Sequence, residues 1–305
     1  MHALEADSVT PRPADDFACP VCGPAAASRP PRVRAVHAGF IVVTCPTCEV
    51  EWQWPRPTPG ALARLYTQEY YDAWGLREDE AVVRAMKLST FDRLLARVEQ
   101  HTRPGALLDV GCATGFLLEA AQRRGWDPYG VEISAYGSTV ARQRFGATHI
   151  MNTRLEDAAF PDRFFSAVTM TDLIEHVLDP VGTLTVAHRL LRPEGIVCIT
   201  TPHVGCLSYV LMGRRWTQYK LEHLQYYRPE AMRRLLSTAG FRVVECRAWP
   251  KTVTLEYVRT QFARYRHWLI SPAVQLVSAA LPRSLRARAL SVPLGDMLVV
   301  AVRHG

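Results

Sequence analysis

A buried apolar run that ends beside an acid and passes into a glycine-spaced loop constrains this chain more than any other feature. Residues 107–110 read LLDV, and the loop at 111–115 reads GCATG. Glycine allows backbone angles closed to other residues, so a ligand can lie against the main chain there. A second apolar run ends in Glu132, 17 residues after Gly115. Strand, loop, helix, strand and acidic tip predict a βαβ unit that binds a nucleoside through its ribose hydroxyls.

This arrangement resembles the first two motifs of class I S-adenosylmethionine-dependent methyltransferases. The loop is spaced GxAxG, whereas the loop of dinucleotide dehydrogenases is spaced GxGxxG. The resemblance implies an α/β fold with a seven-stranded, mostly parallel, Rossmann-like sheet, in which the last strand inserts antiparallel beside the sixth. It also implies S-adenosylmethionine as cofactor, with its methionine end in the loop and its ribose on Glu132. Ala113 replaces the usual middle glycine, and its small methyl group makes this variation tolerable.

Further residues complete the implied cofactor site. The run at 155–157, LED, matches a family run after the third strand, so Glu156 or Asp157 is expected to accept a hydrogen bond from the adenine amino group. The cofactor-binding residues implied by the resemblance are Asp109, Gly111, Ala113, Gly115, Glu132, Ile133, Leu155, Glu156 and Asp172.

Four of the eight cysteines form two CxxC pairs near the N-terminus. Cys19 and Cys22 are separated from Cys45 and Cys48 by 22 residues, a spacing typical of a structural zinc site with four thiolates. Disulfides are not expected in a reducing compartment, and a redox CxxC motif would not be duplicated. The other cysteines are interpreted as packed thiols; they are Cys112, Cys198, Cys206 and Cys246.

The order of these features predicts the domain organisation. Residues 1–16 are expected to form a disordered tail, and residues 17–55 a zinc ribbon that relies on metal for stability. Residues 61–100 carry apolar side chains at helical spacing and predict a helical lid. Residues 101–305 alternate strands and helices and form the cofactor-binding domain. Four aromatic residues of the lid could line the pocket or pack in the core; they are Tyr66, Tyr70, Tyr71 and Trp74.

The fourth predicted strand of that domain ends in the run DLIEHV at 172–177. This run resembles the D-x-x-E-H-V segment of small-molecule methyltransferases, including the ubiquinone-biosynthesis O-methyltransferase group. His176 is the predicted base, because an imidazole takes a proton near neutral pH, and Glu175 could orient it. Two alternatives stay open: Asp172, Glu175 and His176 hold a divalent ion, as in some relatives, or Glu175 and His176 are structural. His203 and His223 are second-rank candidates on loops expected to be more mobile.

The C-terminal region is strongly basic. Between Tyr257 and Gly295 there are six arginines and no acid, interleaved with apolar residues. Segment 253–292 is therefore a basic amphipathic segment, which either rests on an anionic membrane or covers the pocket. With no secretory signal and no apolar stretch of the ~20 residues that a bilayer crossing needs, the protein is expected to be cytoplasmic, with peripheral membrane contact as an open alternative.

The leading functional hypothesis is methyl transfer from S-adenosylmethionine to a hydroxyl or amine of a small molecule, with oxygen favoured over nitrogen. A secondary metabolite, sugar or glycan precursor fits this class. The alternative is an RNA methyltransferase, with the zinc ribbon and the net charge of +7 binding nucleic acid. Strand four lacks the N/D-P-P-Y/F run of many base amino-methyltransferases, so a nucleic-acid partner is not expected. A third hypothesis is a non-catalytic cofactor-binding scaffold.

Overall fold

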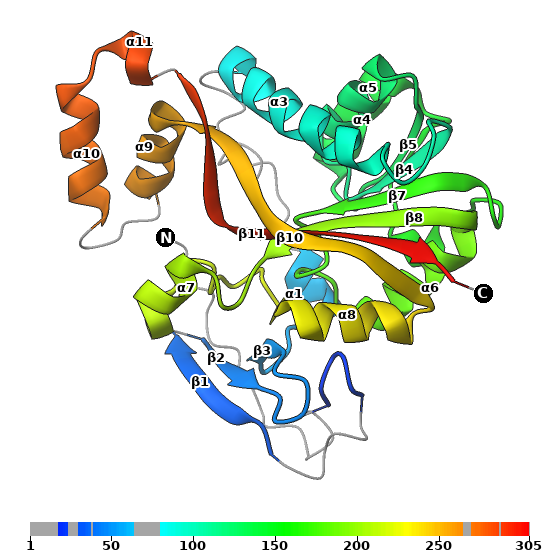
Figure 1. Ribbon diagram of the computed structural model, residues 1–305, viewed down its shortest axis with the longest axis horizontal. Coiled ribbons are helices and arrows are strands. Elements are labelled where there is room, and N and C mark those ends of the chain that lie inside the picture. Colours follow the sequence, from blue (N-terminus) through cyan, green and yellow to red (C-terminus); the bar gives the residue numbers. More distant parts are fainter. Residues whose placement is uncertain are drawn as a thin grey trace.

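The computed structural model describes residues 18–23, 30–37, 39–63, 80–264, 270–286 and 288–304. Within these ranges the main sheet has seven strands in the order β10-β11-β8-β7-β4-β5-β6 (Figure 1). Its strands are β4 (Ala106–Val110), β5 (Asp127–Val131), β6 (Ile150–Met151), β7 (Phe165–Thr171), β8 (Leu191–Pro202), β10 (Phe241–Thr254) and β11 (Ala289–Arg303). The predicted Tyr66, Tyr70, Tyr71 and Trp74 and the tail at 1–16 lie outside the described residues.

The pairing of the strands confirms the predicted fold class. Leu108 of β4 pairs in parallel with Tyr129 of β5 and with Val168 of β7. The last strand, β11, runs antiparallel between β8 and β10. Strands buried on both faces read as continuous apolar runs, and β7 follows this rule with six successive buried residues.

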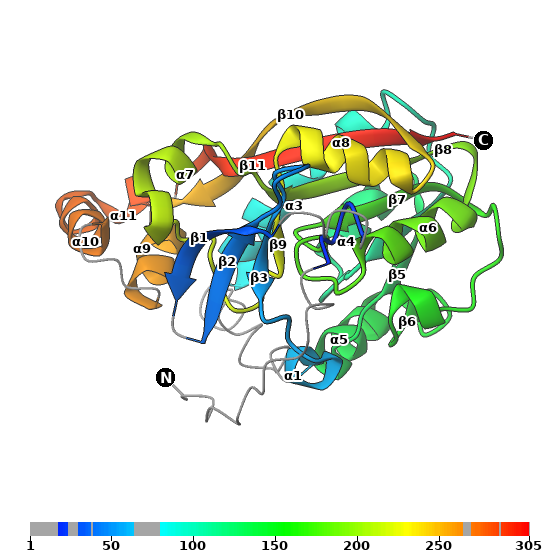
Figure 2. The same ribbon diagram turned by 90° about the horizontal axis from the view of Figure 1, so that it is seen from below.

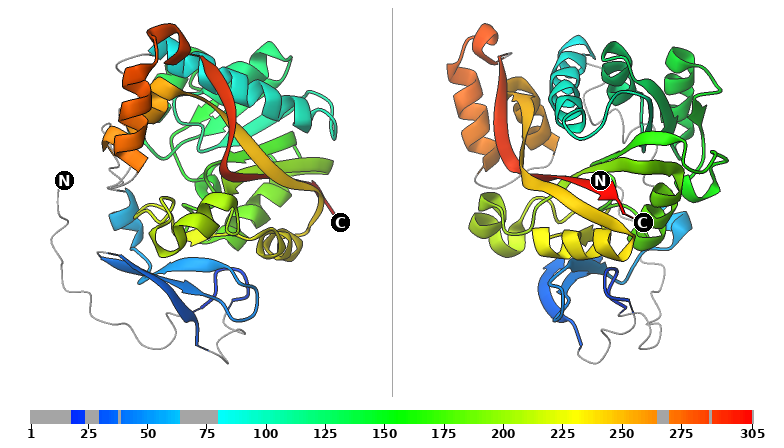
Figure 3. Two further views of the ribbon diagram at one scale, coloured as in Figure 1. Left: turned by 60° about the vertical axis from the view of Figure 1, so that its left-hand side comes forward. Right: turned by 45° about the vertical axis from the view of Figure 1, so that its right-hand side comes forward.

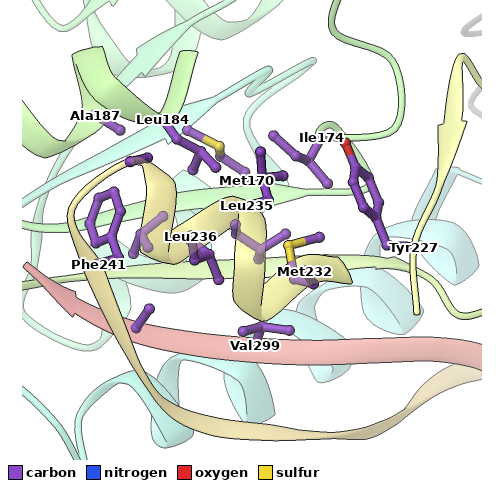
Figure 4. Packing of buried hydrophobic residues seen from close by; sticks show 14 of the residues in the cluster. Met170, Ile174, Leu184, Ala187, Tyr227, Met232, Leu235, Leu236, Phe241 and Val299 are labelled. Atoms are coloured by element: carbon purple, nitrogen blue, oxygen red, sulfur yellow. The ribbon is translucent and has the colours of Figure 1, made fainter. Parts of the chain in front are cut away.

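Two layers of helices cover the two faces of this sheet (Figure 1). One layer contains α3 (Glu80–Val98), α4 (Phe116–Arg123) and α5 (Ala135–Phe145); the other contains α6 (Pro180–Leu190) and α8 (Pro229–Thr238). Because successive side chains of a strand point to opposite faces, Val168 and Met170 pack with the second layer, and Ala167 packs with the first. Figure 4 shows the second interface, where Met232 and Leu235 of α8 lie near Met170 and Val299.

The cysteine-rich region forms a second sheet with the order β1-β2-β3-β9. Its strands are β1 (Arg32–His37), β2 (Phe40–Thr44), β3 (Glu51–Trp54) and β9 (Gln225–Tyr226). β9 follows β3 by about 170 residues in the sequence and pairs antiparallel with it (Figure 2). Val43 and Trp52 belong to the same buried cluster as Tyr227 and Met232, so the ribbon shares a core with the α/β domain.

A buried acid strengthens this junction. Glu51 is 1% exposed and accepts hydrogen bonds from the hydroxyls of Tyr209 and Tyr219, both at 2.6 Å. The Nε atom of Arg34 lies 3.7 Å from the same carboxylate. Tyr209 belongs to α7 (Leu207–Met212), so Glu51 ties the ribbon to the insert between β8 and β9. Both views of Figure 3 show the blue strands of the ribbon beside the yellow-green insert.

The C-terminal basic segment is bounded by strands. β10 and β11 continue past the sheet as a hairpin, with Val253 paired to Leu290. The helices therefore cover a shorter stretch than the predicted 253–292; they are α9 (Leu255–Arg264), α10 (Ile270–Ala280) and α11 (Arg283–Arg286). Among the described residues, no helix combines the length and apolarity that crossing a membrane requires. Contact of this segment with an anionic membrane remains a prediction.

Candidate active site

A cavity of about 470 Å³ opens at the carboxyl ends of β4, β5 and β7. Ligands of open α/β sheets bind at this edge, because loops leave the strands there. Eight of the nine predicted cofactor residues line the cavity: Asp109, Gly111, Ala113, Glu132, Ile133, Leu155, Glu156 and Asp172. Gly115 instead precedes α4 as its N-terminal cap.

The glycine loop turns sharply between β4 and α4. Gly111, Ala113 and Gly115 have φ values of 73°, 49° and 86°, all in the left-handed region that favours glycine. A side chain at Gly111 would meet the Cδ1 atom of Leu173 at 2.9 Å. Ala113 takes a left-handed conformation without being glycine, so the substitution is tolerated at a backbone cost and not merely because its methyl group is small.

Glu132 fixes this loop from the tip of β5. Its carboxylate is 4% exposed and accepts hydrogen bonds from the backbone N–H groups of Ala113 and Ser134, both at 2.8 Å. The first bond holds the glycine loop, and the second holds the start of α5. Glu132 therefore joins the two segments that frame this side of the cavity, while its contact with a ribose remains a prediction.

Asp109 lies at the floor of the cavity and is 2% exposed. The Thr169 hydroxyl donates a hydrogen bond of 2.7 Å to its carboxylate. Burial raises the pKa of Asp109 to about 7, and the nearby charge of Glu132 acts in the same direction. The carboxyl is thus half protonated near neutral pH.

The two acids considered for the adenine side differ in position. Glu156 lines the cavity and accepts a hydrogen bond of 2.5 Å from the Thr183 hydroxyl. Asp157 is outside the set of lining residues and pairs with Arg154 at 3.0 Å, an exposed contact. The structure therefore favours Glu156 as the acid that faces a ligand.

The loop after β7 brings His176 and Asp172 to the opposite side of the cavity. Glu175 turns away into the core, where its carboxylate accepts a 2.9 Å hydrogen bond from the Thr201 hydroxyl. Its Oε1 atom lies 4.0 Å from the His176 Nε2 atom, so Glu175 does not itself hydrogen-bond the imidazole. Burial raises the pKa of Glu175 to about 8 and lowers the pKa of His176 to about 4. Both groups are therefore mainly uncharged at neutral pH.

His223 is buried, contrary to the prediction of a mobile loop. It is 6% exposed, and its ring packs edge-on against His176 with 4.8 Å between the centroids. The backbone N–H of the next residue, Leu224, donates to the Glu175 carbonyl at 2.7 Å and so joins the segment that carries His223 to the loop that carries His176. One ligand atom each from Glu175, His176 and His223 lies within 4.8 Å of the others, a set that suits a divalent ion. His203 does not line the cavity.

Asp172 is engaged by a lysine that the sequence did not single out. The Nζ atom of Lys251 lies 2.8 Å from Asp172 and 3.2 Å from Asp296, which is 4% exposed. These two carboxylates raise the pKa of Lys251. Asp172 is therefore paired with Lys251. In the possible metal-binding set, His223 takes the place predicted for Asp172 beside Glu175 and His176. Asp296 is the first acid after the long acid-free stretch, the one signal that could have drawn attention to it.

The four N-terminal cysteines meet in one cluster, with all sulfur atoms within 4.8 Å of one another. The Cys19 and Cys48 sulfurs lie 3.5 Å apart, close to the ~3.8 Å expected for a tetrahedron with zinc–sulfur bonds of ~2.3 Å. Backbone N–H groups of Cys22 and Thr47 donate to the sulfurs of Cys19 and Cys45 at 3.3 and 3.4 Å. The donor set and its spacing are compatible with a zinc ribbon.

The fold and the cavity define an α/β protein of Rossmann-like methyltransferase architecture. Residues 82–246, more than half of the chain, match the model of a methyltransferase domain family. The chain belongs to this family.

Individual relatives are more distant. The ubiquinone biosynthesis O-methyltransferase of Cereibacter sphaeroides (strain ATCC 17025 / ATH 2.4.3) is 30% identical over 150 residues, which cover 46% of this chain and 61% of that protein. The malonyl-[acyl-carrier protein] O-methyltransferase of Serratia marcescens is 26% identical over 189 residues, covering 61% and 63%. The chain thus spans less than two thirds of either relative. A solved S-adenosylmethionine-dependent methyltransferase from Archaeoglobus fulgidus shares the fold, with 18% identity, a TM-score of 0.51 and coverage of 78% and 100%.

The position of Glu132 predicts a large effect of its removal on ligand binding. In Glu132→Ala, the ribose hydroxyls and the N–H of Ala113 lose their acceptor, at a cost on the order of 2–4 kcal/mol. Calorimetry with S-adenosylhomocysteine should show a dissociation constant raised roughly 30- to 1,000-fold. Asp157→Ala, which alters an exposed acid outside the cavity, should leave the affinity unchanged. Equal affinity of Glu132→Ala and the native protein would refute the assignment.

The raised pKa of Asp109 predicts a pH-dependent gain in stability on its replacement. Because the folded state holds this proton up to about pH 7 and the unfolded chain releases it near the ordinary pKa of 3.8, the group lowers the stability of the fold as pH rises between these values. Asp109→Asn should therefore be more stable than the native protein at pH 8, by roughly 1–4 kcal/mol, and less so at pH 4.5. Urea unfolding of the ligand-free proteins checks this. A stability difference independent of pH would contradict it.

Proposed function

We propose that the chain transfers the methyl group of S-adenosylmethionine to a hydroxyl or amine of a small molecule. The observation that carries the proposal is a single cavity that is lined by the glycine loop, Glu132 and His176. Family membership and the solved structure support the cofactor. The names of the two curated relatives, both O-methyltransferases, favour oxygen as the acceptor atom.

The residues contribute mainly by positioning. When bound, S-adenosylmethionine supplies a methyl group on a positively charged sulfur, which an acceptor lone pair attacks in line. The Gly111–Gly115 loop and Glu132 would orient the donor, and the second wall of the cavity would orient the acceptor; holding two reactants in line replaces a bimolecular encounter. His176 would receive the acceptor proton at a ring nitrogen, since burial keeps the imidazole neutral.

A metal-assisted version of the same reaction has its own supporting geometry. Glu175, His176 and His223 offer a carboxylate and two imidazoles within 4.8 Å, all buried. These residues would hold a divalent ion that polarises the acceptor oxygen. The two versions differ in their response to chelators, so one assay separates them.

Replacement of His176 tests both versions. His176→Gln should lower the rate of methyl transfer by roughly 100- to 10,000-fold and leave S-adenosylhomocysteine affinity intact, since the base acts on the acceptor. The assay uses labelled S-adenosylmethionine with fractionated metabolite pools. Loss of native activity with chelator, and its return with a divalent ion, would assign the metal role. His149→Gln, at a partly exposed position outside the cavity, is the matched control. Native turnover of His176→Gln without metal dependence would exclude both roles and direct attention to His223.

We also propose that Cys19, Cys22, Cys45 and Cys48 hold one structural zinc ion. Four thiolates close a tetrahedral shell and leave no position for a substrate. Elemental analysis of protein purified without chelators should give one zinc per chain, and Cys45→Ser/Cys48→Ser should lose it. Cys246→Ser, a partly buried thiol remote from the cluster in sequence, should retain it. A chain without zinc, or zinc that persists in the double variant, would contradict the proposal.

A further inference from the structure

The loop that carries the candidate base has no regular structure of its own. Residues 172–178 follow β7, and their centre, from Ile174 to His176, is buried. Buried backbone carbonyls without donors are costly, so each needs a partner from elsewhere in the chain. Inside the loop, the N–H of His176 donates to the Leu173 carbonyl at 2.8 Å.

One glutamine supplies most of the missing donors. The side-chain Nε2 atom of Gln225 donates to the carbonyls of Ile174 and Val177 at 2.9 and 2.6 Å. The backbone N–H groups of Leu224 and Gln225 donate to the Glu175 carbonyl at 2.7 and 3.3 Å. The carbonyls on both sides of His176 are thus held by a single side chain, which is fully buried.

The ribbon holds that glutamine in place. Gln225 lies opposite Trp52 in the pairing of β9 with β3, and the Leu224 carbonyl accepts from the N–H of Gln53 at 2.9 Å. Arg56, just past β3, donates through Nη2 to the Gln225 Oε1 atom at 3.2 Å and to the Leu178 carbonyl at 2.5 Å. This arginine orients the amide so that Nε2 faces the loop, and it satisfies the next carbonyl itself.

We propose that Gln225, braced by Arg56 and β3, is a positioning residue that sets the orientation of His176 in the cavity. The ribbon thereby contributes to the acceptor side of the site without touching the acceptor. The catalytic consequence rests on the proposed function, whereas the effect on His176 itself does not.

The test measures the chemical reactivity of His176 without cofactor or acceptor. Diethyl pyrocarbonate modifies neutral, accessible imidazoles, and peptide mass spectrometry reports each histidine separately. Gln225→Met preserves side-chain length and removes both donors. Gln53→Met is the matched control: Gln53 is 3% exposed in the adjoining strand, and no hydrogen bond joins its side chain to the loop. At pH 7, His176 should react about tenfold or more faster in Gln225→Met than in the native protein. The reason is that each hydrogen bond lost lowers the free energy of opening the loop and raises the population of the open form.

The control variant should stay within about twofold of the native rate, and His149 should react equally in all proteins. Arg56→Met removes the brace and the donor to the Leu178 carbonyl but keeps both Gln225 donors, so it should give an intermediate acceleration. This variant decides the question if Gln225→Met shows no cooperative thermal unfolding. His176 reactivity equal to that of Gln53→Met in both variants would overturn the proposal. Once an acceptor is known, kcat should fall in Gln225→Met and not in Gln53→Met. The labelling experiment requires no turnover. Its result on the orientation of His176 therefore stands even if the protein transfers no methyl group.

Discussion

A buried turn at the end of β7 is the constraint on which the arrangement of this protein depends. Residues 172–178 leave the sheet beside the cavity, and within the loop only the Leu173 carbonyl receives a backbone donor. The other carbonyls around its buried centre, from Ile174 to His176, therefore need donors from elsewhere in the chain. The chain meets this need with β9, about fifty residues further on, and β9 in turn needs a partner strand. β3 supplies it, so the cysteine-rich sheet, the insert and the candidate base form one connected structure.

Because of this connection, the ribbon is part of the main domain's structure and not a separate, appended module. A small metal-stabilised domain on a flexible linker would keep a separate core, whereas here ribbon and sheet residues occupy a single buried cluster. Glu51 adds a charged anchor at the same junction, with both tyrosine partners on the insert. Without these two hydroxyls the buried carboxylate would lack hydrogen-bond donors, so the packing of the insert against the ribbon stabilises this junction.

An element could be predicted from the sequence where neighbouring residues determine it, and could not be predicted where it depends on residues far apart in the chain. The parallel strands and the glycine loop were predicted because adjacent residues determine an apolar run or a left-handed turn. The clustering of the four cysteines was predicted from their spacing. β9 has two residues and no periodicity, so no pattern could reveal its pairing with β3. The ion pair of Lys251 with Asp172 and Asp296 depends on a hairpin whose strands are separated by three helices, and the burial of His223 depends on β9.

The charge state of the cavity wall follows from the same burial. Lys251 forms ion pairs with both Asp172 and Asp296, and burial favours the neutral forms of His176 and Glu175. A neutral imidazole would be compatible with the cationic ligand of the proposed function, whereas an imidazolium in the same cavity would repel it, because like charges interact strongly where the effective dielectric constant is low. The desolvation that makes His176 a weak base therefore also removes a repulsion. In the proposed reaction, methyl transfer to a hydroxyl would leave a strongly acidic oxonium, so a weak base in the right position would be sufficient to take its proton.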